Sequence, residues 1–220
     1  MYNPNPENPE DMILKLAERF AKRGVVMPPE QRNIYEKVSE MVTGLTVIDI
    51  GCGTGIGTNI LSREARYVWG IDYDAKNIEF AKQMFERKNT SGIGMTEFEV
   101  LDLVKPPSRE LSRFSVIVCV DVLEHIEDYQ TALNTIKRFY DPGRTTLFLS
   151  TPNRNAEKFK DNQDHPLNPH HIREWTAAEF YDIMIKNFQG VTLFSWDMTT
   201  TVDLDTKVTP LVAKAEGNLI

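Results

Sequence analysis

The chain has 220 residues, 41% of them hydrophobic and 26% charged, and a formal net charge of −7. This size and balance predict one globular domain over residues 1–220 with a substantial core. An acidic chain fits broad nucleic-acid binding poorly, because such binding needs a basic surface. We expect no membrane span and no signal peptide, since long apolar runs and a basic leader are missing. Two cysteines give no disulfide framework, and a cytoplasmic location is expected.

Two helices are expected ahead of the first strand. Apolar residues recur at helical spacing over residues 11–23, and again from Glu30 until Gly44 ends the pattern. We predict that residues 11–43 form a helical cap over the active site. Plain packing on the edge of the sheet is the alternative.

The stretch from Thr46 to Thr58, TVIDIGCGTGIGT, organises the rest of the chain. Its apolar, β-branched start predicts a buried strand, and the glycines after it predict a tight turn into a helix. Glycine lets the backbone lie against a ligand, toward which the next helix points free N–H groups. The dinucleotide fingerprint needs glycine at position 56 or 58, which hold isoleucine and threonine. The spacing Asp-x-Gly-x-Gly-x-Gly over residues 49–55 therefore indicates a different cofactor.

The remaining chain alternates between strand and helix patterns. Short apolar runs predict strands at residues 67–71, 96–100, 114–120, 145–150, 191–196 and 208–213. Asp74 is expected to cap a helix, and Thr176 and Glu179 are expected to form a capping box. The last two strands should pair as a hairpin, because no helical pattern separates them. The predicted fold is α/β: a Rossmann-like three-layer sandwich around a mostly parallel seven-stranded sheet with a C-terminal antiparallel hairpin.

An acid closes the second predicted strand. Asp72 lies about twenty residues after the glycine turn, where nucleotide-binding folds hold a ribose through its two hydroxyls. A carboxylate can accept both hydroxyl hydrogens at once. An exposed turn acid is the alternative interpretation of Asp72.

These features together resemble the class I S-adenosylmethionine (SAM) methyltransferases, over nearly the whole chain. The terminal hairpin separates this family from dinucleotide-binding folds, which continue with parallel units. The resemblance implies SAM as cofactor, with its methionine end at the glycine turn, its ribose at Asp72 and its adenine amino group at Asp102. The cofactor-binding residues that it implies are Asp49, Gly51, Cys52, Gly53, Gly55, Asp72, Tyr73, Asp102, Leu103 and Val120.

The segment Asp121-Val-Leu-Glu124-His125 follows the fourth predicted strand, on the rim where such sheets bind ligands. If a helical turn starts at Asp121, the three polar side chains share one face and could hold a divalent cation. The pattern resembles the E-x-x-E-H motif that ubiquinone-biosynthesis O-methyltransferases and small-RNA 2′-O-methyltransferases use as Mg²⁺ ligands. Asp121 replaces the first Glu and shortens that arm. Many relatives have the same motif with no metal claimed, and this frequency favours a metal-free pocket wall.

A second polar pattern lies in the irregular segment 151–175, which we predict to be a substrate-side loop. Thr151-Pro-Asn and the later His171-x-x-Glu-Trp-Thr resemble a pattern of the same broad family, in which this histidine completes the metal site or faces the substrate. His165 and His170 are further candidates for a base. The metal hypothesis therefore places Mg²⁺ at Asp121, Glu124, His125 and His171, whereas the metal-free hypothesis makes Glu124, His125 and His171 catalytic and gives a proton to an imidazole.

The predicted function is SAM-dependent methylation of a hydroxyl on a small molecule or sugar. A metal-assisted 2′-O-methyltransferase acting on an RNA 3′ end is one alternative. This RNA hypothesis is disfavoured because neither an added RNA-binding domain nor a basic surface is visible in the sequence. A protein that binds SAM without catalysis is the other alternative.

Overall fold

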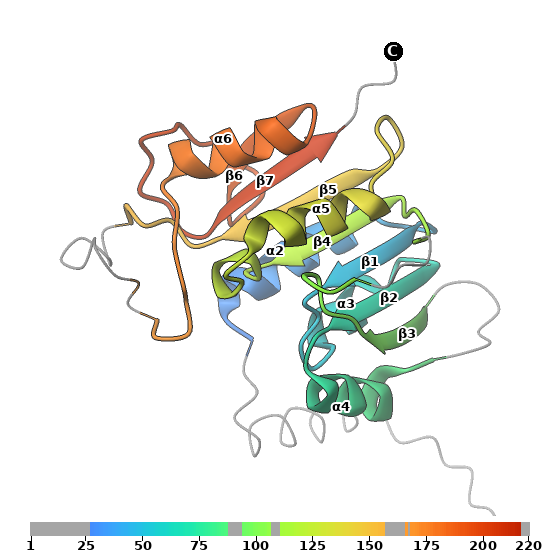
Figure 1. The fold of residues 1–220 in the computed structure, drawn as a ribbon. Helices are drawn as coiled ribbons and strands as arrows, with labels where there is room; N and C mark the ends of the chain where they lie inside the picture. Colours follow the sequence, from blue (N-terminus) through green and yellow to red (C-terminus); the bar gives the residue numbers. More distant parts are fainter. Residues whose placement is uncertain (1–26, 88–93, 107–110, 157–165, 167, 217–220) are drawn as a thin grey trace, which may run out of the picture.

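The computed structural model describes residues 27–87, 94–106, 111–156, 166 and 168–216, and Figure 1 shows them around one sheet. The helix expected over residues 11–23 and the candidate base His165 lie outside the described residues. The sheet has seven strands in the order β3-β2-β1-β4-β5-β7-β6. Their bounds are β1 Thr46–Ile50, β2 Tyr67–Asp72, β3 Met95–Val100, β4 Val116–Val120, β5 Thr146–Thr151, β6 Val191–Ser195 and β7 Leu211–Glu216.

The first five strands are parallel, and β7 runs antiparallel to both β5 and β6. The predicted mostly parallel sheet with an antiparallel C-terminal hairpin is therefore confirmed. The last strand was predicted from position 208, which is wrong by three residues. Pro210 lacks the N–H that a strand interior needs, and the Asn153 amide takes the carbonyl of Val208 at 2.9 Å. The ladder consequently starts at Leu211.

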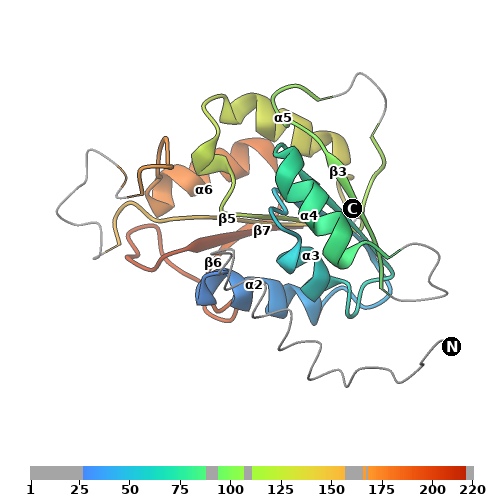
Figure 2. The same cartoon turned by 90° about the horizontal axis from the view of Figure 1, so that it is seen from below.

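Helices cover both faces of the sheet, as Figure 2 shows with the strands seen edge-on. Two of them, α2 and α3, lie on one face, and α5 and α6 lie on the other. The bounds are α2 Pro29–Ser39, α3 Ile56–Leu61, α4 Ala75–Phe85, α5 Tyr129–Phe139 and α6 Ala177–Asn187. The Asp74 cap and the Thr176–Glu179 capping box are both present, so these predicted helix starts are confirmed.

Side chains alternate between two apolar layers along the central strands. On β1, Val47 packs toward α2 and α3, whereas Ile48 and Ile50 pack toward α5 and α6. All five residues of β4 are buried, as expected for a parallel strand covered on both faces. The central strands are thereby held rigid, and their carboxyl ends carry the polar residues of the candidate site.

Helix α2 is fitted closely onto the start of α3. Gly57, the second residue of α3, faces the ring of Tyr35, and a Cβ built at Gly57 would lie 2.3 Å from that ring. The Tyr35 side chain is 4% exposed and reaches past α3 to the carboxylate of Asp49. The absence of a side chain at Gly57 therefore lets α2 approach the glycine turn.

We predict that Gly57→Ala destabilises the protein by about 1–3 kcal/mol, because the added methyl overpacks the contact with Tyr35. Urea unfolding measures this loss. In a Tyr35→Ala background the same substitution should be neutral or stabilising, since the clash is gone and alanine is the better helix former. Equal losses in both backgrounds would show that the Tyr35 contact is not the cause.

Candidate active site

A cavity of about 170 Å³ lies between α2 and the glycine turn. Its walls are formed by Met27, Gln31, Tyr35, Gly51, Cys52, Gly53, Thr54, Ile56 and Val120. Four of the predicted cofactor residues are among these: the three residues of the turn from Gly51 to Gly53, and Val120 at the end of β4. The neighbouring strands β1 and β4 thus place both parts of the predicted pocket side by side.

The glycines of the turn serve different purposes. Gly51, Gly53 and Gly55 all have positive φ, at 70°, 51° and 85°. A Cβ at Gly55 would meet Ala81 on α4 at 2.9 Å, so that glycine allows helix packing. A Cβ at Gly53 would meet no protein atom within 4 Å. It would instead project into open space at the cavity wall, which fits a backbone that lies against a cofactor.

Asp72 holds the glycine turn in place. One carboxylate oxygen accepts the N–H of Gly53 at 2.9 Å, and the other accepts the N–H of Asp74 at 2.8 Å. Burial is the main cause that raises the pKa of Asp72, and these two N–H groups oppose the rise. The Asn77 side chain also opposes the rise. The arrangement fits the predicted ribose contact. It also shows that Asp72 fixes the backbone of the glycine turn, which the sequence did not reveal.

Asp49 lies beneath the turn and does not line the cavity. It is fully buried, and its carboxylate accepts the hydroxyls of Thr58 at 2.6 Å and Tyr35 at 2.9 Å. Burial raises its pKa to about 6. Asp49 therefore ties the strand, the helix after the turn and α2 together.

The residues predicted near the adenine differ widely in exposure. Tyr73 is 77% exposed, and Asp102 is partly exposed with one oxygen accepting the N–H of Val104 at 2.9 Å. Leu103 is instead buried in the apolar layer next to α5, where its carbonyl accepts the Thr135 hydroxyl. Asp72 ends β2, and Tyr73 and Asp102 lie just beyond the ends of the adjacent strands β2 and β3, while Leu103 contributes packing.

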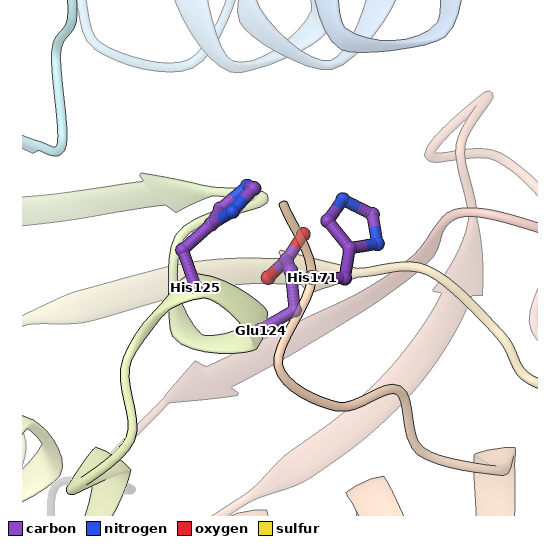
Figure 3. A group of neighbouring side chains, drawn as sticks. All are labelled: Glu124, His125 and His171. Atoms are coloured by element: carbon purple, nitrogen blue, oxygen red, sulfur yellow. The ribbon is translucent and has the colours of Figure 1, made fainter. Parts of the chain in front are cut away.

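Glu124, His125 and His171 form a cluster beside the cavity end of β4, and Figure 3 shows the carboxylate between the two imidazoles. One possible ligand atom from each residue lies within 4.8 Å of the others. Glu124 is fully buried, and burial is the first cause that raises its pKa well above the usual range. The nearby Thr151 hydroxyl opposes that rise. Within the described residues, neither this hydroxyl nor either Glu124 oxygen has a hydrogen-bond partner.

The two imidazoles are oriented by contacts of their Nδ1 atoms. His125 Nδ1 lies 2.9 Å from the carbonyl of His170, and His171 Nδ1 lies 2.7 Å from the Glu174 carboxylate. Acceptors at both positions place the hydrogens on Nδ1, which leaves a lone pair on each Nε2. The amide of Asn168 contacts Nε2 of His171 at 2.8 Å. Histidines prepared in this way can accept a proton or bind a metal ion.

Asp121 departs from the predicted arrangement. The helical turn expected to start there is instead a single 3₁₀ turn over Leu123–His125, and Asp121 precedes it with a φ of 52°. Its carboxylate accepts Ser150 Oγ at 2.5 Å and Gln31 Nε2 at 2.9 Å, and it is not part of the cluster. The expected common face of Asp121, Glu124 and His125 is therefore wrong, because the left-handed backbone at Asp121 is not the start of a helical turn.

The loop after β5 brings the second histidine to the first. The N–H of Ile172 donates to the carbonyl of Glu124 at 2.8 Å, which fixes the loop against the 3₁₀ turn. His170 is exposed and contributes its carbonyl to the site. Glu174, which is 4% exposed, was not among the predicted site residues, although its spacing from His171 was visible in the sequence. Gln31 and Tyr35 were missed because nothing in a helix pattern marks which polar residue faces a ligand.

Comparison with known proteins agrees with this geometry. A methyltransferase domain family model matches residues 6–192. A probable S-adenosylmethionine-dependent methyltransferase from Mycolicibacterium smegmatis is 30% identical over 151 residues, covering 69% of this chain and 54% of that protein. A ubiquinone biosynthesis O-methyltransferase from Leptothrix cholodnii is 28% identical, covering 60% and 54%. The chain thus spans about half the length of the curated relatives it matches.

A solved structure shows the same fold. The TehB-like SAM-dependent methyltransferase from Corynebacterium glutamicum superposes with a TM-score of 0.60 at 21% identity, covering 96% of this chain and all of that one. The chain belongs to the methyltransferase domain family, and the predictions of a class I methyltransferase domain and of SAM as its cofactor are confirmed. In the described ranges, every helix is too short or too polar to cross a membrane.

We predict that Gly53→Ala weakens SAM binding by roughly tenfold or more, because the new methyl occupies space at the cavity wall. Calorimetric titration with SAM measures the loss. Gly44→Ala is a matched control, since Gly44 also has positive φ, at 71°, and open space around it, but is an exposed loop residue that does not line the cavity. Both variants should lose about 1 kcal/mol of stability to backbone strain. If Gly53→Ala binds SAM normally, the turn has only a structural role and does not lie against the cofactor.

We predict that the free energy of unfolding falls as the pH rises from about 4 to about 6, because Asp49 ionises over this range. Its pKa is about 6 in the fold against 3.8 for the free group, so the folded state binds the proton more tightly. Stability gained by protonation is then lost on ionisation, by up to roughly 3 kcal/mol. Urea unfolding of wild type and Asp49→Asn across this range should show the wild type falling relative to the variant. Parallel curves would contradict the assignment.

Proposed function

We propose that this domain transfers the methyl group of SAM to a hydroxyl of a small molecule, with a divalent cation held by Glu124, His125 and His171. The observation that supports the proposal most is the fully buried Glu124 carboxylate, unpaired among the described residues, beside two imidazoles with their Nδ1 hydrogens already engaged. A buried carboxylate without a partner is costly, and a cation or a proton removes that cost.

The donor set fits a cation. Three acceptor groups converge, and each imidazole has the outer contact that metal-binding histidines usually make, to a carbonyl at His125 and to a carboxylate at His171. Two nitrogens and one carboxylate oxygen favour a borderline ion such as Mn²⁺ or Co²⁺ over Mg²⁺. To take part, Nε2 of His171 must give up its contact with Asn168. Asp121 contributes charge nearby without being a ligand in this arrangement.

A divalent ion at these residues would lower the pKa of a bound substrate hydroxyl. A hydroxyl must lose its proton more easily in this way before it can attack a sulfonium methyl group. The chain itself supplies the alignment. The glycine turn and Val120 form the walls of the cofactor cavity, and the short turn after β4 leads directly from Val120 to Glu124. The His171 loop, docked on the Glu124 carbonyl, closes the opposite side.

We favour a small acceptor over RNA. Some relatives are ubiquinone biosynthesis O-methyltransferases by their printed name, and a net charge of −7 disfavours broad binding of a polyanion. A non-catalytic SAM-binding role does not account for the buried Glu124, which is unpaired among the residues that the structure describes.

We predict that Glu124→Ala and His171→Ala each reduce turnover by on the order of 100-fold, and that the double variant loses little more, because the residues act as one unit. The release of S-adenosylhomocysteine from a panel of hydroxyl acceptors measures turnover. His170→Ala is the matched control, since only its backbone carbonyl contacts the cluster.

The metal part of the proposal has its own readouts. Titration with Mn²⁺ should give one site that Glu124→Ala abolishes, and chelation should stop turnover until Mn²⁺ or Co²⁺ is restored. Activity indifferent to chelators that falls as the pH drops through about 6.5 would instead identify an imidazole base. If the protein instead binds RNA in a salt-sensitive way and methylates RNA ends, the proposal of a small-molecule acceptor is wrong.

A further inference from the structure

We propose that Gln31 and Asp121 form a positioning pair that holds α2 closed over the cofactor cavity. The side-chain amide of Gln31 donates to Asp121 at 2.9 Å, across 90 positions of sequence. Gln31 also forms part of the cavity wall, and Asp121 directly follows Val120, which forms another part. The pair therefore stands between the cofactor cavity and the catalytic cluster.

The cavity is complete only when α2 is docked. Gln31 and Tyr35 are four residues apart on α2, so they share one side of the helix and form the α2 wall of the cavity, and Met27 adds to that wall from just before the helix. Without that wall, the glycine turn would face open solvent on this side. The hydrogen bonds that dock α2 therefore slow the dissociation of a bound cofactor.

Two polar contacts tie α2 to carboxylates on neighbouring strands. Tyr35 donates to Asp49 on β1, and Gln31 donates to Asp121 immediately after β4. The Tyr35 end is also fixed by apolar burial, since Ile34 and Val38 are 0% exposed. Gln31 lies one turn nearer the start of the helix and is only partly buried. Its hydrogen bond therefore contributes a larger share of the docking at that end.

The backbone of Asp121 is held in a shape that serves this contact. Its φ of 52° is left-handed, a conformation that aspartate and asparagine adopt more readily than most residues. Ser150 on β5 donates to one carboxylate oxygen at 2.5 Å and accepts the Asp121 N–H at 3.0 Å. These contacts leave the other oxygen for Gln31. The same geometry explains why the aspartate is absent from the cluster.

A reversed pair tests the proposal. Gln31→Glu places two carboxylates face to face and should open the contact. Adding Asp121→Asn restores it with the donor on the other side, because the new amide can donate to Glu at 31 while its oxygen still accepts from Ser150. Asparagine also tolerates the left-handed backbone. Gln31→Ala removes the donor without repulsion and serves as a second variant.

Binding, not turnover, is the readout, because removal of the Asp121 charge also alters the cluster. Titration calorimetry and stopped-flow dissociation with S-adenosylhomocysteine should show Gln31→Glu weakened by roughly tenfold or more, mainly through faster dissociation. Gln31→Ala should be weakened less. The double variant should return to within about threefold of wild type.

Asn33→Ala is the matched control. Asn33 is also on α2 and donates to the body of the protein, at the Trp196 carbonyl 3.0 Å away, but it does not line the cavity. It should leave the affinity unchanged, with melting temperatures of all apoproteins close together. Wild-type affinity in both Gln31 variants, a double variant no tighter than Gln31→Glu, or an equal loss in Asn33→Ala would each overturn the proposal.

Discussion

Four carboxylates crowd the carboxyl ends of three adjacent strands, and much of the site follows from how each one is satisfied. Asp49 belongs to β1, Asp72 ends β2, and Asp121 and Glu124 follow β4. Burial is the first cause that raises the pKa of every one of them, and neighbouring acids add to it, since Asp72 raises the pKa of Asp49 and Asp121 raises that of Glu124. An acidic rim in low dielectric attracts cations, and both a sulfonium cofactor and a divalent ion are cations.

The four acids differ in their partners, and the differences separate their roles. Asp49 is satisfied by two hydroxyls, Asp72 by two backbone N–H groups, and Asp121 by a hydroxyl and an amide. Each of these three therefore fixes a piece of chain: α2 with α3, the glycine turn, and the start of α2. Glu124 alone among them is without a hydrogen-bond partner in the described residues. An acid left in this condition inside a well-packed protein indicates a site for a group that the described part of the chain does not supply.

Periodicity and glycine spacing predicted the fold because both are consequences of local physics. A parallel strand buried on both faces favours apolar residues throughout, as in Val116–Val120, and a turn with positive φ favours glycine. Asp121 could not be placed in the same way, since its φ of 52° comes with contacts to Ser150 and Gln31 from distant parts of the chain. Asp49 was assigned to the cofactor by its motif, although the hydroxyls that surround it come from two helices. The start of β7 shifted for a similar reason, because Asn153 takes the backbone carbonyls before Pro210.

Helix α2 and the glycine turn are coupled because Tyr35 contacts both of them. Its hydroxyl binds the Asp49 carboxylate while its ring lies against Gly57, so a displacement of α2 must disturb both the floor of the turn and the first residues of α3. The N-terminal region of α2 is connected to a different strand end, through Asp121. Movement at that end opens the cavity without unpacking the floor. The structure thus divides α2 into a half that shapes the cofactor turn through Tyr35 and a half that is tied to the rest of the protein by the hydrogen bonds of Gln31 and Asn33, the first of them close to Glu124.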